Sequence, residues 1–124
     1  MNYEDRVTKQ YIEDALAGAG AKIAAGQYTG NGAETRTISV GFTPKAVWIC
    51  DYAGIIYKGS NTNSTYHGGV MTPDSPLVDI AGNAGAHVTA GGFVVTKKRI
   101  TNGSYNYDHY TNEANVRFYY LAIG

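Results

Sequence analysis

The sequence has a single cysteine, Cys50, and this scarcity excludes an internal disulfide and a cysteine-rich zinc site. Ten basic and ten acidic residues cancel, so the chain lacks the basic footprint of a nucleic-acid-binding protein and the polybasic patch that attracts anionic lipid. No segment approaches the roughly 20 apolar residues that cross a bilayer. The charged start MNYEDRVTKQ also lacks the apolar core of a signal peptide. We therefore expect a protein made in a cytoplasm, with no nucleic-acid partner and no membrane insertion.

Tyrosine and glycine are present in excess, at 11 and 16 of 124 residues, and 16% of the chain is charged. Tyrosine favours strands and interfaces, where one end of the ring is apolar and the other is wet. Glycine at this density marks many turns and bulges. A mass of 13.3 kDa allows one domain with a modest core. The composition is therefore typical of a folded chain with a surface made largely of neutral polar groups.

Residues 2–17 form the one segment with helical periodicity, which begins at a capping Asn2 and ends before Gly18 and Gly20. Its apolar strip consists of Val7, Tyr11 and Ala15, with Ile12 and Leu16 beside them. A helix of about four turns is marginal alone in water. The strip is therefore expected to pack on the body of the protein, against copies of itself, or on a partner. We assign residues 1–20 to an attachment or oligomerisation helix with its hinge, and residues 21–124 to a second unit.

From residue 23 onwards the pattern predicts β-structure. Residues 35–42 alternate, with Ile38, Val40 and Phe42 on one side. Residues 46–52, AVWICDY, form a continuous apolar run, which predicts a central strand covered on both faces, with Trp48 in the core and Cys50 as a buried, inert thiol. Residues 59–69 read as a polar loop or a weak edge strand, and strands are expected around Gly91–Gly92 and at the C-terminus. Seven to nine short strands at this spacing predict an all-β fold, an antiparallel β-sandwich of jelly-roll type preceded by the short α-helix.

The glycine-rich stretch TGNGAETRT, residues 29–37, raises the question of a phosphate-binding loop. Such loops need a GxxxxGK[ST] or GxGxxG pattern that opens a helix. Here strand alternation follows the glycines, and no lysine stands at the required place. We therefore predict a hairpin, with a tight turn at Asn31–Gly32.

The residues that carry metal or catalytic chemistry show no diagnostic spacing. His67, His87 and His109 form no HxH, HxxxH or HExxH pattern and are expected to be exposed loop histidines without a metal. There is no GxSxG elbow. The carboxylates available for a glycosidase pair are Asp74, Asp79, Asp108 and Glu113, and their spacing favours no pair. We expect no enzyme activity and no cofactor, and we read residues 97–99 as a solvated strand end.

Two polar segments, residues 57–67 and 102–112, concentrate tyrosine, histidine and asparagine. This composition is typical of adaptable recognition surfaces, and sugars bind by stacking on aromatic rings and by hydrogen bonds to amides. The alternative is that YNYDHY, residues 105–110, is an ordinary strand with one buried face, or an oligomer interface. The candidate ligand-binding residues are Tyr57, Tyr66, His67, Tyr105, Tyr107, His109 and Tyr110.

The stretch GQYTGNGAETRTISVGFTPKAVWIC, residues 26–50, resembles a module of bacteriophage and prophage tail-region fibre or appendage proteins. Residues 91–95 and 112–124 resemble the end of the same module, and residues 6–21 are similar to the attachment helices that precede phage fibre domains. The resemblance implies a homotrimeric protein on the surface of the virion, made in the host cytoplasm and bound to other virion proteins through its N-terminal helix. It implies a tail fibre or receptor-binding role with host polysaccharide as a partner, or alternatively a head fibre or capsid decoration protein.

Overall fold

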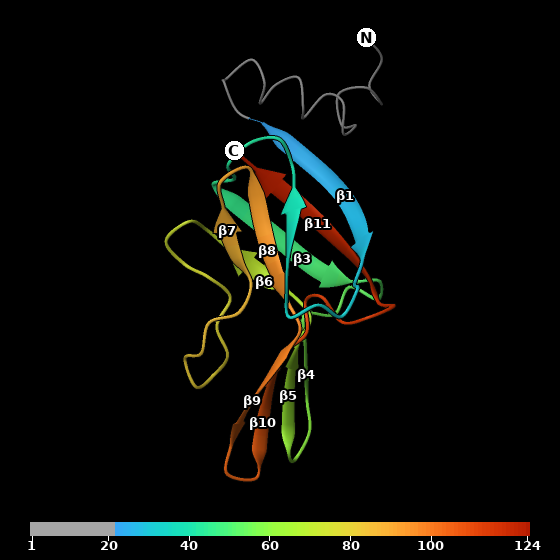
Figure 1. Cartoon of the computed structure of the whole chain (residues 1–124), viewed down its shortest axis with the longest axis vertical. Coiled ribbons are helices and arrows are strands. Elements are labelled where there is room, and N and C mark those ends of the chain that lie inside the picture. The colour runs from blue at the N-terminus through green and yellow to red at the C-terminus, as the bar shows by residue number, and fades with distance from the viewer. Residues whose placement is uncertain (1–21) are drawn as a thin grey trace, which may run out of the picture.

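The computed structural model describes residues 22–124, and this part of the chain is all-β (Figure 1). The predicted attachment segment, residues 1–20, lies outside the described residues, and so do Val7, Tyr11, Ile12 and Leu16. Residues 22–124 form eleven strands, more than the seven to nine expected. In chain order they are β1 (Ile23–Thr29), β2 (Thr35–Ser39), β3 (Ala46–Asp51), β4 (Tyr57–Gly59), β5 (Asn63–Tyr66), β6 (Gly69–Met71), β7 (His87–Thr89), β8 (Gly92–Thr96), β9 (Lys98–Asn102), β10 (Tyr105–His109) and β11 (Arg117–Ile123).

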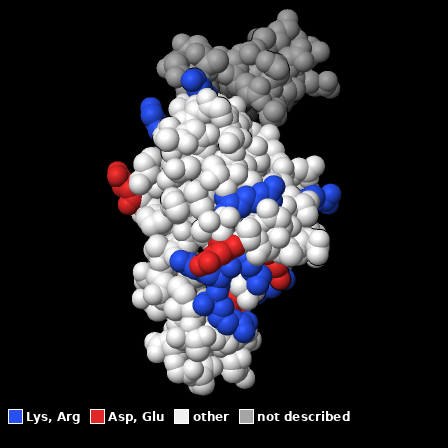
Figure 2. Space-filling view, in the orientation of Figure 1, with Lys and Arg blue, Asp and Glu red and all other residues white. Residues whose placement is uncertain are grey.

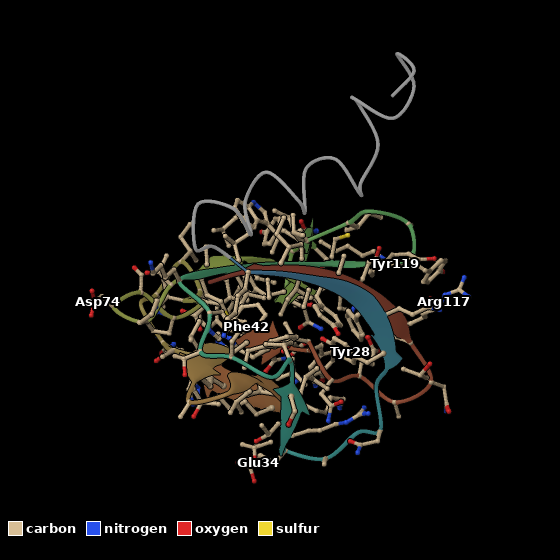
Figure 3. All side chains as sticks on the ribbon, turned by 90° about the horizontal axis from the view of Figure 1, so that it is seen from above. Tyr28, Glu34, Phe42, Asp74, Arg117 and Tyr119 are labelled. Carbon is tan, nitrogen blue, oxygen red and sulfur yellow. The ribbon has the colours of Figure 1, made fainter. Side chains whose placement is uncertain are left out.

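The strands make three sheets. The large sheet has the order β1-β11-β3-β6, the small sheet β2-β8-β7, and the distal sheet β4-β5-β10-β9. All pairings are antiparallel except that of β5 with β10, which is parallel. The large and small sheets face each other and form the body (Figure 3), and the distal sheet projects from one end of it (Figure 1).

The core lies between the large and small sheets and follows from strand alternation. Tyr28 points from β1 into the space between the sheets (Figure 3), stacks on Phe118 at 5.2 Å and lies 6.3 Å from Phe93 between ring centroids. Burying each such ring contributes about 1.5–3 kcal/mol to stability. The buried apolar side chains are Tyr28, Val47, Ile49, Met71, Ala86, Phe93, Val95, Phe118 and Ala122.

The prediction that Trp48 and Cys50 lie in the core is wrong. Strand β3 is central in its sheet, between β11 and β6, as predicted. However, Val47, Ile49 and Asp51 point inward, while Trp48 on the other face is 43% exposed and Cys50 is half-buried. The continuous apolar run therefore reflects two apolar faces, of which the described residues cover one.

The glycine-rich stretch does not form the predicted hairpin. Strand β1 pairs with β11 and β2 pairs with β8, so residues 30–34 cross from the large to the small sheet. Gly32 has a positive φ of 76°, as a tight turn requires, but Asn31 does not. The N–H of Gly32 donates instead to the Asn112 carbonyl at 3.0 Å, and the Asn112 side chain donates to Asn31 Oδ1 at 2.7 Å. These long-range hydrogen bonds replace the local ones of a hairpin.

The other strand predictions were accurate for some strands and wrong for others. The pair around Gly91–Gly92 and the C-terminal strand are confirmed as β7, β8 and β11, and the strand predicted at residues 35–42 is formed over residues 35–39 as β2. The prediction of a loop or edge strand at residues 59–69 is wrong for residues 63–66, because they form β5, which lies inside the distal sheet between β4 and β10. The segment YNYDHY forms the strand β10, which closes a hairpin with β9.

Candidate functional site at the distal sheet

The register of the distal sheet sorts the candidate residues onto two faces. Tyr66 pairs with Tyr57 on β4 and with His109 on β10, so these side chains share one face. Tyr107 lies opposite Ser64, and Tyr105 precedes it by two residues on the same face. We call this the aromatic face; it comprises Tyr57, Ser64, Tyr66, Tyr105, Tyr107 and His109. The two remaining candidates, His67 and Tyr110, each follow the end of a strand and line the opposite side of the sheet.

The aromatic face consists of two groups of ring contacts, which Ser64 links through hydrogen bonds. The ring of Tyr66 lies 5.2 Å from that of Tyr57 and stacks on His109 at 5.6 Å, and Tyr105 lies 5.0 Å from Tyr107. The Ser64 hydroxyl is hydrogen-bonded to the Tyr105 hydroxyl at 2.6 Å. Tyr57 is exposed, so this face presents aromatic area to solvent at its edge.

His109 is buried rather than exposed, which corrects the sequence prediction. Its Nε2 lies 2.8 Å from Oδ2 of Asp79, which belongs to the segment between β6 and β7 and is equally buried. Burial alone would raise the pKa of Asp79, but hydrogen bonds from His109 and from Asn83 outweigh it and hold this pKa below its usual range. His109 therefore fixes the 72–86 segment to the root of the distal sheet and is not accessible to a ligand.

A cleft of about 430 Å³ lies on the other side of the distal sheet, where the sheet meets the body. Figure 2 shows charged side chains gathered at this level of the molecule. Alternation places Lys58, Thr65, Asp108 and Arg99 side by side on this face, because they pair across β4, β5, β10 and β9. The lining residues are Asp51, Tyr52, Lys58, Asn63, Thr65, His67, Arg99, Asp108, Tyr110, Glu113 and Val116.

His67 is buried at the base of the cleft between two carboxylates, and it too is not the exposed loop histidine that was predicted. Its Nδ1 lies 3.0 Å from Asp51 Oδ2, and its Nε2 lies 2.7 Å from Glu113 Oε2. Both nitrogens donate only in the imidazolium form, so this geometry suits a positively charged ring between two negative groups. Burial would raise the pKa of Asp51, but hydrogen bonds from the Ile55 N–H and from His67 hold it below its usual range.

A second ion pair lines the cleft. Arg99 donates to Asp108 through Nε at 2.7 Å and Nη2 at 3.1 Å, a bidentate geometry that raises the pKa of the guanidinium. The ammonium group of Lys97 lies 4.1 Å from the ring centre of Tyr110, a cation–π contact. Residues 97–99 are therefore more than the solvated strand end that was predicted.

The cleft carries charged groups of both signs. Its lining holds the carboxylates of Asp51, Asp108 and Glu113 and the cations Lys58 and Arg99. His67 lies between two of the carboxylates, and Arg99 pairs with the third. Such a lining offers both hydrogen-bond donors and acceptors, and suits a neutral polar ligand better than an ion. Within residues 22–124, no three His, Cys, Asp or Glu side chains are placed to hold a metal ion.

Sequence reasoning found the two segments, but of the eleven residues that line the cleft it singled out two, His67 and Tyr110. Among the residues it did not single out for binding are Asp51, Tyr52, Lys58 and Arg99. The available signal was alternation: in YNYDHY, Tyr105, Tyr107 and His109 lie on one face, so Asp108 and Tyr110 had to point to the other. Nothing local in the sequence indicated that Arg99 or Asp51 would join them.

Comparisons with known proteins add no relative: no family model matches the chain, and no curated protein or solved structure was found to be similar to it. In the part of the chain that the structure describes, no helix is long and apolar enough to cross a membrane.

Proposed function

We propose that this protein is a bacteriophage virion protein, a short tail fibre or receptor-binding appendage that contacts glycan on the host surface. The motif in residues 26–50, with its counterpart at the C-terminus, supports membership of a phage appendage module. In this proposal the large and small sheets are the two layers of a β-sandwich that displays the distal sheet. The protein acts by binding, without catalysis or a cofactor.

One observation carries the recognition role. The fold brings the two tyrosine-rich segments, residues 57–67 and 102–112, onto adjacent strands of one projecting sheet. Between this sheet and the body lies a cleft of about 430 Å³, within the range of roughly 300–1,000 Å³ that is usual for ligand sites.

The chemistry of the cleft favours a neutral sugar as ligand. Sugar hydroxyls donate to carboxylates and accept from ammonium and amide groups, and the cleft supplies both kinds of partner in Glu113, Lys58 and Asn63. Sugar rings also stack on aromatic faces, which Tyr110 and the 63%-exposed Tyr52 offer at this site. The three carboxylates of the lining argue against a strongly anionic polysaccharide.

The test is binding of the full chain to an array of bacterial surface glycans, followed by titration of the best ligand. Tyr52→Ala and Tyr110→Ala each remove one stacking ring, worth about 0.5–1.5 kcal/mol, so affinity falls between twofold and about tenfold. Tyr57→Ala on the aromatic face is the matched control and leaves affinity unchanged. Binding that both cleft variants retain in full, or no binding to any neutral glycan, contradicts the proposal.

The place on the particle is tested separately, by electron microscopy of virions labelled with antibody against this chain. Label at the tail tip or fibres supports the receptor-binding role. Label on the capsid instead favours the alternative, a head fibre or decoration protein with a structural and weakly adhesive role. If the label is absent from purified particles, the protein is not a virion component.

We also propose that the protein is a homotrimer and that residues 1–20 attach it to other virion proteins. Light scattering on the purified full chain gives the mass directly, and a single copy at micromolar concentration contradicts the trimer. A pull-down of virion proteins, lost when residues 1–20 carry substitutions, tests the attachment role.

A further inference from the structure

The outer face of the large sheet is apolar. Alternation places Trp48 on β3, Leu121 on β11 and Val70 on β6 in one row, with Tyr119 and Cys50 in the next row. Tyr119 points away from the core in Figure 3. Trp48, Val70 and Tyr119 are 43%, 51% and 39% exposed. They border a groove of about 310 Å³, whose other side chains include Ile56 and Leu121.

The exposed apolar area of this face indicates how large a partner can cover it. Aromatic side chains carry roughly 150–250 Å², so Trp48 and Tyr119 each leave roughly 60–110 Å² open at their exposures. With Val70 and Ile56, the open apolar area is on the order of 300–400 Å², a patch large enough to signal a contact surface. It is about half of the roughly 800 Å² that each partner gives to a stable protein–protein interface. A single amphipathic segment fits this area better than a second copy of the body.

We propose that residues 2–17 of the same chain cover this face, with the apolar strip of the predicted helix against Trp48 and Tyr119. The strip comprises Val7, Tyr11 and Ala15, with Ile12 and Leu16 beside them. This inference rests on the proposed attachment role of residues 1–20 and makes that role more specific. The apolar strip of the helix packs on the sheet, and the polar side of the helix remains free to bind other virion proteins.

The point at which the chain enters the large sheet supports this occupant. The N–H of Lys22 donates to the Gly124 carbonyl at 2.6 Å, and the Gly124 N–H donates to the Lys22 carbonyl at 2.9 Å. The preceding residues therefore start beside the end of the β1–β11 ladder, on the sheet whose outer face is open. Residues 18–21, GAGA, have no bulky side chain to prevent the chain from turning back over that face.

The lengths also agree. A helix of 16 residues is about 24 Å long at 1.5 Å per residue. The seven residues of β11 span about 23 Å at 3.3 Å per residue. The predicted helix is therefore long enough to run the length of β11, past Leu121 and Tyr119.

The experiment uses two natural probes on this face, because Trp48 is the only tryptophan and Cys50 the only cysteine of the chain. In the full chain, iodide quenches Trp48 weakly and a thiol reagent modifies Cys50 slowly. Replacing Ile12→Asp together with Leu16→Asp raises both rates at least about threefold. The matched control, Gln10→Asp with Ala17→Asp, adds the same charge on the opposite side of the helix and changes neither rate. Equal behaviour of the two double variants, with the β-sheet circular dichroism intact, overturns the proposal.

A cross-link separates docking within one chain from docking between chains and does not depend on a disruptive variant. Val7→Cys, treated with a short bifunctional maleimide, joins Cys50 within a single chain, whereas Arg6→Cys on the polar side of the helix does so at least about threefold less. A product of two chains assigns the face to another copy and overturns the proposal. The probe rates and the cross-link are both measured without glycan and without virions. A negative result therefore counts against the docking of the helix and not against the proposed function.

Discussion

The contact between Asp79 and His109 leads to the most direct prediction, the effect of Asp79→Ala. The carboxylate accepts from the Ala81 N–H at 2.9 Å, from the Asn83 N–H at 3.0 Å and from His109 Nε2 at 2.8 Å. The side chains of Asp79 and His109 are both almost fully buried. Removing the carboxylate leaves His109 without this acceptor in a place that water does not reach.

The expected loss is large relative to the stability of the domain. Breaking a buried pair by removal of one partner costs about 3–5 kcal/mol, against a total of about 5–15 kcal/mol for a domain of this size. Urea unfolding, followed by circular dichroism, measures the change at pH 7. Asp74→Ala is the control, because Asp74 lies in the same segment, points into solvent (Figure 3) and is exposed, so its removal changes stability by less than about 0.5 kcal/mol.

A double-mutant cycle tests whether the pair itself is responsible. His109→Ala alone, Asp79→Ala alone and both together give a coupling energy of at least about 1 kcal/mol if the two side chains stabilise each other. Additive losses, or an Asp79→Ala loss as small as that of the Asp74→Ala control, refute the reasoning.

The same pair gives a pH dependence with a definite sign. The pKa of Asp79 is lowered in the folded protein, so its stabilisation is fully present above the unfolded pKa of about 4. It is lost as the pH falls through the lower folded value. The difference between the wild type and Asp79→Ala therefore holds at pH 5–7 and shrinks below about pH 4.

Three further substitutions test the body. Phe93→Ala removes a fully buried ring and lowers the unfolding free energy by about 3–5 kcal/mol in urea, and a loss below 1 kcal/mol contradicts its place in the core. Gly68→Ala brings a methyl group against the Ile49 carbonyl, so we expect at least about 1–3 kcal/mol of destabilisation; an unchanged melting curve rules out this close approach. Tyr28→Phe deletes the hydroxyl that donates to the buried Thr111 carbonyl at 2.6 Å, which costs about 0.5–1.5 kcal/mol by the same assay unless the contact is absent.

The strands that the sequence predicted well are those whose pattern is set by near neighbours. The alternation that begins at residue 35 and the turn at Gly91 are local; the strand is formed over residues 35–39, and the turn is formed. Trp48 was misplaced because an apolar run does not tell whether one face or both are covered. The turn at Asn31–Gly32 was misplaced because hydrogen bonds to Asn112, about 80 positions away in the chain, override the local preference for a hairpin.

The candidate site was harder to predict from the sequence than the strands, because it depends on contacts between distant residues. The tyrosine-rich segments were recognised by composition, but their meeting depends on the parallel pairing of β5 with β10, which no turn between them announces. The burial of His67 and His109 followed from carboxylates 16 and 30 residues away. A histidine in a polar segment is usually solvated, and only the tertiary partner decides otherwise.

These two histidines show how the body positions the proposed binding surface. His67 directly follows β5 and His109 ends β10, so they lie at the root of adjacent strands and point to opposite faces. One bonds to Asp51 of the large sheet, and the other to Asp79 of the 72–86 segment. The projecting sheet is therefore fixed to the body from both sides by directional, charged hydrogen bonds, which set an orientation more narrowly than non-directional apolar contact does. Because His67 and Asp51 also line the cleft, the groups that hold the sheet in place help to define the shape of the site proposed to receive the sugar.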